Sequence, residues 1–160
     1  MSESGEKLTP MQQRAQNRCF GCGPANPIGL HLEFFTTEHS SVLCVPEIPA
    51  SFEGNAGYLH GGIIATLLDE AMSKSVRMCG YTCMTRHMEV DYQRPVPSST
   101  PIRIEGRMTR SEGRKHWTEA KIMNTHGTVL AQGKGLFVEV TIERAKAWAA
   151  AKPPETWVED

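Results

Sequence analysis

Apolar residues between Tyr58 and Gly80 recur at the three- and four-residue spacing of one helical face. The apolar positions are Ile63, Ile64, Leu67, Leu68, Ala71, Met72 and Val76. The pattern predicts one long, mostly apolar helix that starts at Tyr58 and closes near Gly80, which can serve as a terminal glycine. Asp69 stands between two of these positions, so we expect it at the edge of the buried face.

Two glycines, Gly61 and Gly62, fall in the first turn of the predicted helix. Glycine is a poor helix former, so a pair at this point needs a physical reason. One reason is a ligand that approaches free backbone N–H groups at the positively polarised helix start. The other is a turn followed by close packing of the helix against a sheet.

The remaining apolar residues largely alternate with polar residues, which is the pattern of half-buried strands. The predicted strands are Leu30–Thr37, Val42–Ile48, Cys83–Tyr92, Ile102–Thr109, His116–Asn124 and Val129–Val140. Short turns join the later strands, so we expect antiparallel pairing and an α+β fold. Because the helix is apolar over much of its girth, a curved sheet wrapped around it would provide the cover it needs.

The length and charge of the chain restrict its organisation and its partners. A chain of 160 residues is long enough for one domain with one core. We predict a loose arm over residues 1–17, a domain over 18–141, and a helix and tail over 142–160. The net charge of −1 does not indicate a nucleic-acid or acidic-membrane partner. No segment is long and apolar enough to span a bilayer.

Five cysteines and a polar start without a secretory hydrophobic region predict free thiols in a reducing cytoplasm. Cys19 and Cys22 form a Cys-x-x-Cys pair, which could supply half of a zinc site. A structural zinc site needs four ligands, and the chain has no second pair at suitable spacing. His31 and Cys44 could join only through folding. We therefore predict a turn with reduced thiols and no metal, with zinc as the alternative.

Several motifs occur in an order that resembles one protein family. The set comprises Leu59–Gly62 with Asp69 nine positions after the histidine, Val90–Pro97 with its Arg-Pro ending, Gly127–Gly133, and the opening Cys19–Gly23. In this order they resemble the hotdog-fold acyl-CoA thioesterases of the PaaI-like, phenylacetate-pathway branch. The opening is similar to that of members near the human mitochondrial long-chain thioesterases. The resemblance implies an antiparallel sheet around one central helix, and hydrolysis of an acyl- or aryl-CoA to free acid and CoA.

The resemblance also implies roles for individual residues. Asp69 matches the catalytic carboxylate, which acts as nucleophile or as general base for water. Gly61 matches the backbone N–H that polarises the thioester carbonyl, and Thr85 matches the residue that places the attacking water. We expect His60 to shape the helix start by hydrogen bonding rather than to act as a base. Glu70 lies about 100° around the helix from Asp69, so we expect it to face solvent, with a catalytic role as the alternative.

Other residues are candidates for contact with the substrate. Relatives carry an asparagine six positions before the histidine, where this chain has Gly54 followed by Asn55. The phosphates of CoA need cations at the mouth of a pocket. The predicted substrate-binding residues are Asn55, Tyr58, Gly62, Arg86, Arg114 and Lys115. We expect His31, His87, His116 and His126 to be ordinary surface or strand residues.

The spacing of Gly61 and Asp69 bears on assembly. Eight residues of helix separate them by about 12 Å, yet both must reach the same thioester. Two antiparallel copies of the helix would bring Gly61 of one subunit to Asp69 of the other. We therefore predict a homodimer with shared sites, with a tetramer made of two such dimers as the alternative. We expect no cofactor, because CoA is part of the substrate, and no nucleic-acid or membrane partner.

Two other functions remain open at this point. A hotdog-fold hydratase or dehydratase would act on acyl thioesters with a histidine and an acid in another arrangement. A non-catalytic acyl-CoA binder would keep the pocket without turnover, although a carboxylate beside an apolar acyl chain would then have little use. The sequence leaves the acyl chain itself undetermined.

Overall fold

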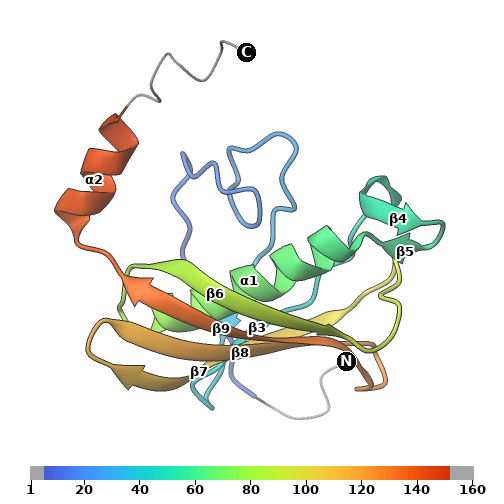
Figure 1. Cartoon of the computed structure of the whole chain (residues 1–160). Coiled ribbons are helices and arrows are strands. Elements are labelled where there is room, and N and C mark those ends of the chain that lie inside the picture. The colour runs from blue at the N-terminus through green and yellow to red at the C-terminus, as the bar shows by residue number, and fades with distance from the viewer. Residues whose placement is uncertain (1–5, 152–160) are drawn as a thin grey trace.

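The computed structural model describes residues 6–151 of the chain. The first residues of the predicted arm, 1–5, and residues 152–160 of the predicted tail lie outside this part. Seven antiparallel strands form one curved sheet, and helix α1 (Gly61–Met78) lies across one of its faces (Figure 1). Across the sheet the strands are ordered β1 (Thr9–Pro10), β2 (Phe35–Thr36), β3 (Val42–Cys44), β7 (Arg103–Glu112), β8 (Lys115–Met123), β9 (Val129–Glu139) and β6 (Cys83–Tyr92). This confirms the predicted α+β class.

Smaller elements lie at the two ends of the helix and sheet. A short 3-10 helix (Ala50–Phe52) leads into a hairpin of β4 (Glu53–Asn55) and β5 (Tyr58–Leu59) beside the start of α1. Helix α2 (Ile142–Ala150) extends away from the sheet in Figure 1, and its described side chains are mostly exposed. Neither α1 nor any other described helix has the length and apolar character needed to cross a membrane.

The apolar face of α1 packs on the sheet as its spacing predicts. Leu67, Leu68, Ala71 and Met72 have no exposed surface, and burying a large apolar side chain stabilises the fold by about 1.5–3 kcal/mol. The helix comes so close to the sheet that a Cβ atom on Gly106 of β7 would lie 2.5 Å from the Ala71 carbonyl oxygen. Glycine at position 106 therefore allows the close packing of helix and sheet.

The predicted start of the helix at Tyr58 is wrong by three residues. Tyr58 and Leu59 form strand β5, and α1 begins at Gly61 with His60 as its N-cap. The Leu59 N–H donates to the Val96 carbonyl oxygen at 2.9 Å, which holds this segment in an extended conformation. A tertiary hydrogen bond thus overrides the helical pattern at the boundary.

The two strands predicted before the helix are shorter than expected. Only Phe35–Thr36 and Val42–Cys44 pair in the sheet. The N–H groups of Leu30 and Leu32 instead donate to carbonyl oxygens in the turn that contains Cys19 and Cys22, and His31 has a positive φ of 50°. At the other end of the arm, Thr9–Pro10 pairs with β2, so this part belongs to the sheet rather than to a loose arm.

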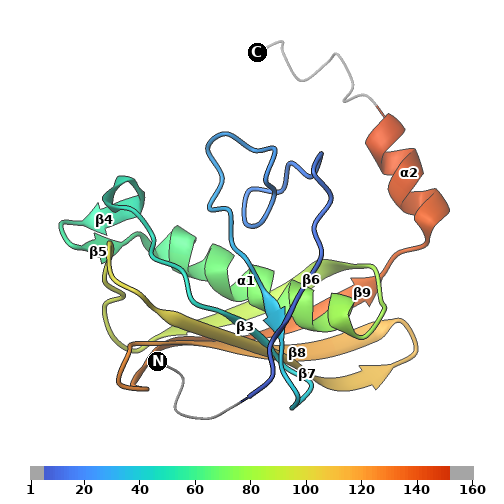
Figure 2. The same ribbon diagram turned by 180° about the vertical axis from the view of Figure 1, so that it is seen from behind.

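The segment between β1 and β2 covers the face of α1 that points away from the sheet, as Figure 2 shows. Its turn of residues 17–32 is held by its own hydrogen bonds, among them Gly23 N–H to the Cys19 carbonyl oxygen at 2.8 Å. The side chain of Cys22 is buried there, and all five cysteines are free thiols. Helix α1 is therefore packed between two layers.

One histidine lies in a different environment from the one predicted. His116 on β8 is fully buried, stacks on Tyr81 with ring centroids 4.1 Å apart, and contacts the Ser111 hydroxyl at 2.9 Å. Its Nε2 has no hydrogen-bond partner among the described residues. His116 is a strand residue, as expected, but it belongs to the core rather than the surface.

Candidate active site

The backbone N–H groups around the start of α1 are satisfied one after another, with one exception. Those of Leu59 and His60 donate to carbonyl oxygens of neighbouring loops at 2.9 and 3.0 Å. That of Gly62 donates to the His60 side chain, and that of Ile63 donates to the His60 carbonyl oxygen, both at 2.9 Å. Only the Gly61 N–H has no acceptor among the described residues. The helix start thus presents one free donor, at the residue predicted to polarise a carbonyl.

His60 is the N-cap of α1, and its side chain binds the N–H next to that of Gly61. Its Nδ1 accepts the Gly62 N–H, so the neutral ring carries its proton on Nε2. A histidine fixed in this way orders the first turn of the helix, which is the contact expected of a residue that shapes the helix start. The arrangement leaves the N–H of the residue between them pointing out of the helix without a partner.

Tyr92 lies over Gly61 and was not among the predicted site residues. Its hydroxyl donates to the Gly61 carbonyl oxygen at 3.1 Å, and its ring would be 3.7 Å from a Cβ atom on Gly61. The ring is half exposed. Nothing in the local pattern links these two residues, because 31 positions separate them and the contact depends on how β6 crosses the helix.

Asp69 contacts Thr85 near the other end of β6, where this strand crosses the helix. The Thr85 hydroxyl donates to Asp69 Oδ1 at 2.8 Å. Burial raises the pKa of the Asp69 carboxyl, the Thr85 hydrogen bond opposes this effect, and the neighbouring charge of Glu70 adds to it. A half-buried carboxylate held by one uncharged hydroxyl is a stronger base than an exposed one, which suits acid–base or nucleophilic chemistry.

A β-bulge in strand β6 places both Thr85 and Tyr92 on the helix side of the sheet. Residues seven positions apart on a regular strand point to opposite faces, because side chains alternate. Here the register with β9 shifts between Thr85 and His87, which makes Arg86 the extra residue. Met88 and Val90 then pack on the core, and Tyr92 reaches Gly61. The bulge thus brings both polar contacts to one side of β6.

Glu70 is not the solvent-facing residue that its helical position suggested. Only 12% of its side chain is exposed, and it pairs with Lys74 at 3.3 Å, the i,i+4 spacing of a helix. Cys19 Sγ lies 3.5 Å from its Oε2. The prediction was wrong because the turn of residues 17–32 covers this face of α1, and a helical pattern cannot show cover from a distant segment.

Comparison with known proteins agrees with the geometry. The sequence model of the thioesterase superfamily matches residues 56–131, which include the helix start, Asp69 and Thr85. A solved thioesterase superfamily protein superposes with a TM-score of 0.73 at 28% identity, covering 76% of this chain and 60% of that one. The chain resembles the thioesterase superfamily in sequence and in fold. This confirms the resemblance drawn from the motifs, and with it the hotdog fold.

Two further proteins are similar to this chain. Acyl-coenzyme A thioesterase THEM4 from Xenopus laevis is 29% identical over 109 residues, which cover 67% of this chain and 49% of that protein. The chain therefore spans about half the length of this curated relative. The E. coli PaaI protein from the phenylacetic acid degradation operon has the same fold, with a TM-score of 0.65 at 14% identity, covering 70% of this chain and 81% of that one.

The predicted substrate-binding residues are distributed over three places in the hotdog domain. Asn55 and Tyr58 are exposed and paired in the hairpin of β4 and β5, next to the helix start that holds Gly62. Arg86 is exposed in the bulge of β6, beside Thr85. These residues surround the candidate site, and their contact with a substrate stays a prediction.

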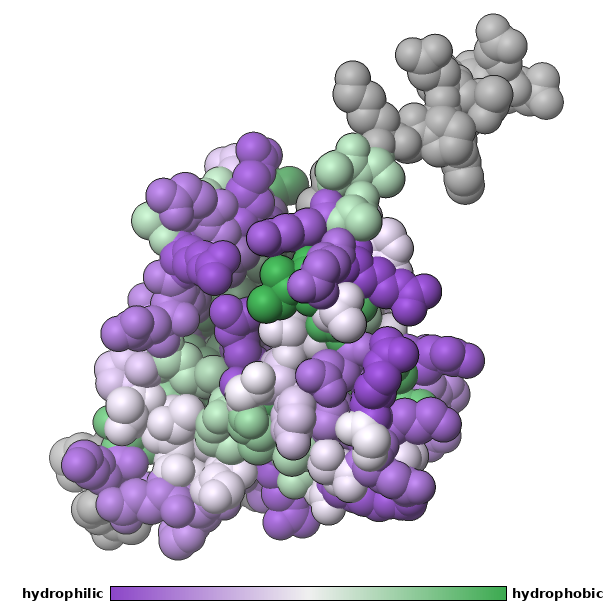
Figure 3. All heavy atoms as spheres, turned by 90° about the vertical axis from the view of Figure 1, so that its left-hand side faces the viewer, coloured by the Kyte–Doolittle hydropathy of each residue, from purple (hydrophilic) through white to green (hydrophobic). Residues whose placement is uncertain are grey.

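Arg114 and Lys115 lie farther away, at the turn between β7 and β8. The Arg114 guanidinium donates to the Glu139 carbonyl oxygen at 2.8 Å, so it already holds the end of β9. Figure 3 shows this end of the molecule, whose surface is mostly hydrophilic. Arg110 stacks on Trp117 here, 4.3 Å from the ring centroid, and both line a surface pocket with Arg114 and Lys115. Binding of a CoA phosphate at this turn remains a prediction.

Proposed function

We propose that the protein is an acyl-CoA thioesterase, which hydrolyses the thioester of an acyl- or aryl-CoA to the free acid and CoA. The observation that carries the proposal is that one helix holds both Asp69, bound by Thr85, and a Gly61 N–H that has no acceptor among the described residues. Thioester hydrolysis needs a base or nucleophile and a donor for the carbonyl oxygen, and these two groups can supply them. The similarity to THEM4, an acyl-coenzyme A thioesterase, supports the choice of substrate.

In the proposed reaction Asp69 acts on the carbonyl carbon directly or through water. As a general base it takes one proton from water while the hydroxide adds to the thioester carbon. The Gly61 N–H stabilises the negative charge that develops on the carbonyl oxygen. The tetrahedral intermediate then expels the CoA thiolate, which takes up a proton. Thr85 fixes Oδ1 of Asp69, so that Oδ2 remains for the attacking water, and its own oxygen can accept from that water.

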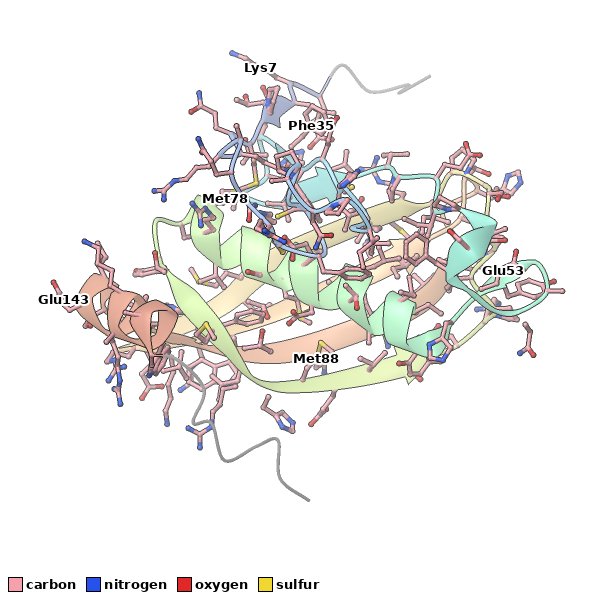
Figure 4. The ribbon with its side chains drawn as sticks, turned by 90° about the horizontal axis from the view of Figure 1, so that it is seen from above. Lys7, Phe35, Glu53, Met78, Met88 and Glu143 are labelled. Atoms are coloured by element: carbon pink, nitrogen blue, oxygen red, sulfur yellow. The ribbon has the colours of Figure 1, made fainter. Side chains whose placement is uncertain are left out.

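The two groups are too far apart to act together within one subunit, because eight helical residues span about 12 Å. Strand β6 offers a way to bring two subunits together. It has ten residues, most of them exposed. It is an edge strand of the sheet, and Figure 4 labels Met88 on it. An edge of this length is a template for pairing with a second strand.

Pairing β6 with the β6 of a second copy would assemble a shared site. If two antiparallel β6 strands meet with their two-fold axis at Glu89, Thr85 of one subunit lies opposite Tyr92 of the other, because the bulge makes Arg86 an extra residue. Tyr92 lies over Gly61, and Thr85 holds Asp69. The partner's Gly61 would then approach Asp69, and the dimer would contain two equivalent sites.

The test is a panel of aryl-, medium-chain and long-chain acyl-CoAs, with release of free thiol as the measurement. Enoyl-CoAs are assayed in parallel for loss of the conjugated double bond. Thiol release from at least one saturated substrate class, abolished in the Asp69→Asn variant, would support the proposal. Binding without thiol release would identify an acyl-CoA binder, and hydration of the enoyl substrates alone would identify a hydratase; either result would overturn it.

A further inference from the structure

The turn of residues 17–32 brings two thiols and a carboxylate together on the far side of α1. One ligand atom each from Cys19, Cys22 and Glu70 lies within 4.8 Å of the other two, with Cys19 Sγ 3.5 Å from Glu70 Oε2. Cys22 is 3% exposed. The cluster joins residues about 50 positions apart in the sequence and takes no part in the chemistry proposed for Asp69 and Gly61.

Local backbone contacts point both sulfurs of the turn toward the helix. Asn17 accepts the Cys19 N–H through its side chain at 3.0 Å. A Cβ atom on Gly21 would lie 2.7 Å from Glu70 Oε2, and one on Gly23 would lie 2.4 Å from the Cys19 nitrogen. A larger side chain at Gly21 would displace the Glu70 carboxylate, and one at Gly23 would distort the turn itself. Glycine at position 21 therefore leaves room for Glu70 beside the turn, and glycine at position 23 lets the turn close.

We propose that Cys19, Cys22 and Glu70 bind one Zn²⁺ through two sulfur atoms and one carboxylate oxygen, with water as the fourth ligand. Zinc prefers four tetrahedral ligands drawn from cysteine, histidine and carboxylate, at about 2.3 Å for sulfur and 2.0–2.2 Å for oxygen. Ligand atoms around such an ion are about 3.5–3.8 Å apart. The three ligand atoms within 4.8 Å need to move together by only about 1 Å.

Lys74 completes the charge balance of the proposed site. Its ammonium donates to Cys22 Sγ at 3.0 Å and pairs with Glu70 at 3.3 Å. Two thiolates and a carboxylate carry three negative charges, which one Zn²⁺ and one ammonium neutralise in full. Binding replaces the two thiol protons, which leave to solvent, so no oxidant or reductant is required. Hydrogen bonds from a neighbouring group to a metal ligand are a regular feature of zinc sites.

A surface pocket gives the ion a path to the cluster. Cys22 lines this pocket together with Gln13, His31 and Glu33, so this buried residue borders a surface opening. The bound ion would fasten the turn of residues 17–32 to α1, one residue away from Asp69. Its role would be structural, because the cluster and the Asp69–Thr85 pair lie on different sides of the helix.

Cobalt substitution in the full-length, reduced protein tests the proposal. Co²⁺ bound by thiolates gives a near-ultraviolet charge-transfer band and visible d–d bands, which identify cysteine ligation directly. We expect saturation at one Co²⁺ per chain, loss of the bands on addition of Zn²⁺, and a Tm that rises with Zn²⁺. The charge-transfer band should disappear in the Cys19→Ser, Cys22→Ser double variant. Glu70→Gln should keep this band and weaken metal binding at least about tenfold.

The matched control is the Cys79→Ser, Cys83→Ser double variant, which alters two thiols outside the cluster and should keep all bands. Circular dichroism checks that each variant is folded, and a thiol count checks that Cys19 and Cys22 are reduced. The wild-type measurement decides the matter even if the cluster variant does not fold. No thiolate band in the reduced wild-type protein, or a band that persists in the folded cluster variant, would overturn the proposal.

Discussion

Asp69 and Glu70 are neighbours on one helix, yet their carboxylates lie in two different environments. Asp69 faces β6, where its only hydrogen-bond partner among the described residues is the uncharged hydroxyl of Thr85. Glu70 faces the turn of residues 17–32, where the ammonium of Lys74 compensates its charge. The rotation of about 100° between consecutive helical residues separates the two sides.

This difference in environment indicates which of the two carboxylates is free to react. A carboxylate that is desolvated without a cation has a raised pKa and keeps an oxygen available, as at Asp69. A carboxylate paired with a lysine is occupied and contributes to stability instead. The raised pKa of Asp69 even depends in part on the charge of Glu70, so the two sides of the helix are electrostatically linked.

The strongest test of this comparison is neutralisation of each acid in turn. Asp69→Asn keeps the shape of the side chain and removes its charge, so turnover of acyl-CoA should fall by about two to four orders of magnitude. Glu70→Gln should change turnover by less than about threefold, because Glu70 does not face the site. Steady-state thiol release measures both variants, and folding is checked by circular dichroism. A dead Glu70→Gln beside an active Asp69→Asn would reverse the assignment.

Mixed dimers test whether the Asp69 side of one subunit works with the helix start of another. One chain carries Asp69→Asn, and the other carries Gly61→Pro, which removes the free N–H. Mixing two inactive variants should restore about a quarter of the wild-type activity. With random exchange half of the dimers are mixed, and each has one intact site of two. Differently tagged chains confirm that mixed dimers form. If these dimers are inactive, each subunit builds its own site.

Thr85 determines how well the reactive carboxylate is held, so its loss should have a smaller effect. Thr85→Ala removes the hydroxyl bound to Asp69 Oδ1, and the rate constant kcat should fall by about one order of magnitude. Thr85→Ser keeps the hydroxyl and should recover most of the loss. The Michaelis constant should stay nearly unchanged in both variants. A raised Michaelis constant with an unchanged kcat would make Thr85 a residue that binds substrate.

The side of α1 that faces the sheet could be predicted largely from the sequence. Strand β6 runs over Cys83–Tyr92 as predicted, and the helical stripe correctly placed Leu67 and Met72 in the core. These features follow from local periodicity and from alternation along one strand. The resemblance also singled out Thr85 as the residue that places the attacking water; the structure puts its hydroxyl on Asp69, and the role itself stays a prediction.

The opposite side of α1 could not be predicted in the same way. The partners of Glu70 lie about 50 residues earlier, in a turn whose position depends on tertiary hydrogen bonds. Tyr92 was missed for a related reason, because its approach to Gly61 depends on a bulge at Arg86. A bulge changes the face of the sheet to which the following residues point. The pattern of apolar and polar residues changes too little for the bulge to be predicted from it.

The smallest expected effect is on stability, where the two acids should respond with opposite sign. Glu70→Gln leaves the ammonium of Lys74 with the Cys22 sulfur but without an anionic partner in a mostly buried place, which should cost about 1–3 kcal/mol in metal-free buffer. Asp69→Asn removes a desolvated charge while Oδ1 of the new side chain can still accept from Thr85. Its Tm at neutral pH should therefore rise, by roughly 2 °C, since solvent screens part of the penalty at a half-buried carboxyl.

The pH dependence of the Asp69→Asn effect identifies its cause. The folded-state pKa of Asp69 lies above the ordinary value of 3.8, so the folded state binds more protons than the unfolded state between the two values. Wild-type stability therefore falls as the pH rises through this window, and the asparagine variant lacks that loss. The Tm advantage should be present at neutral pH and vanish toward about pH 4. An advantage that does not change with pH would mean that packing, and not the buried charge, separates the two variants.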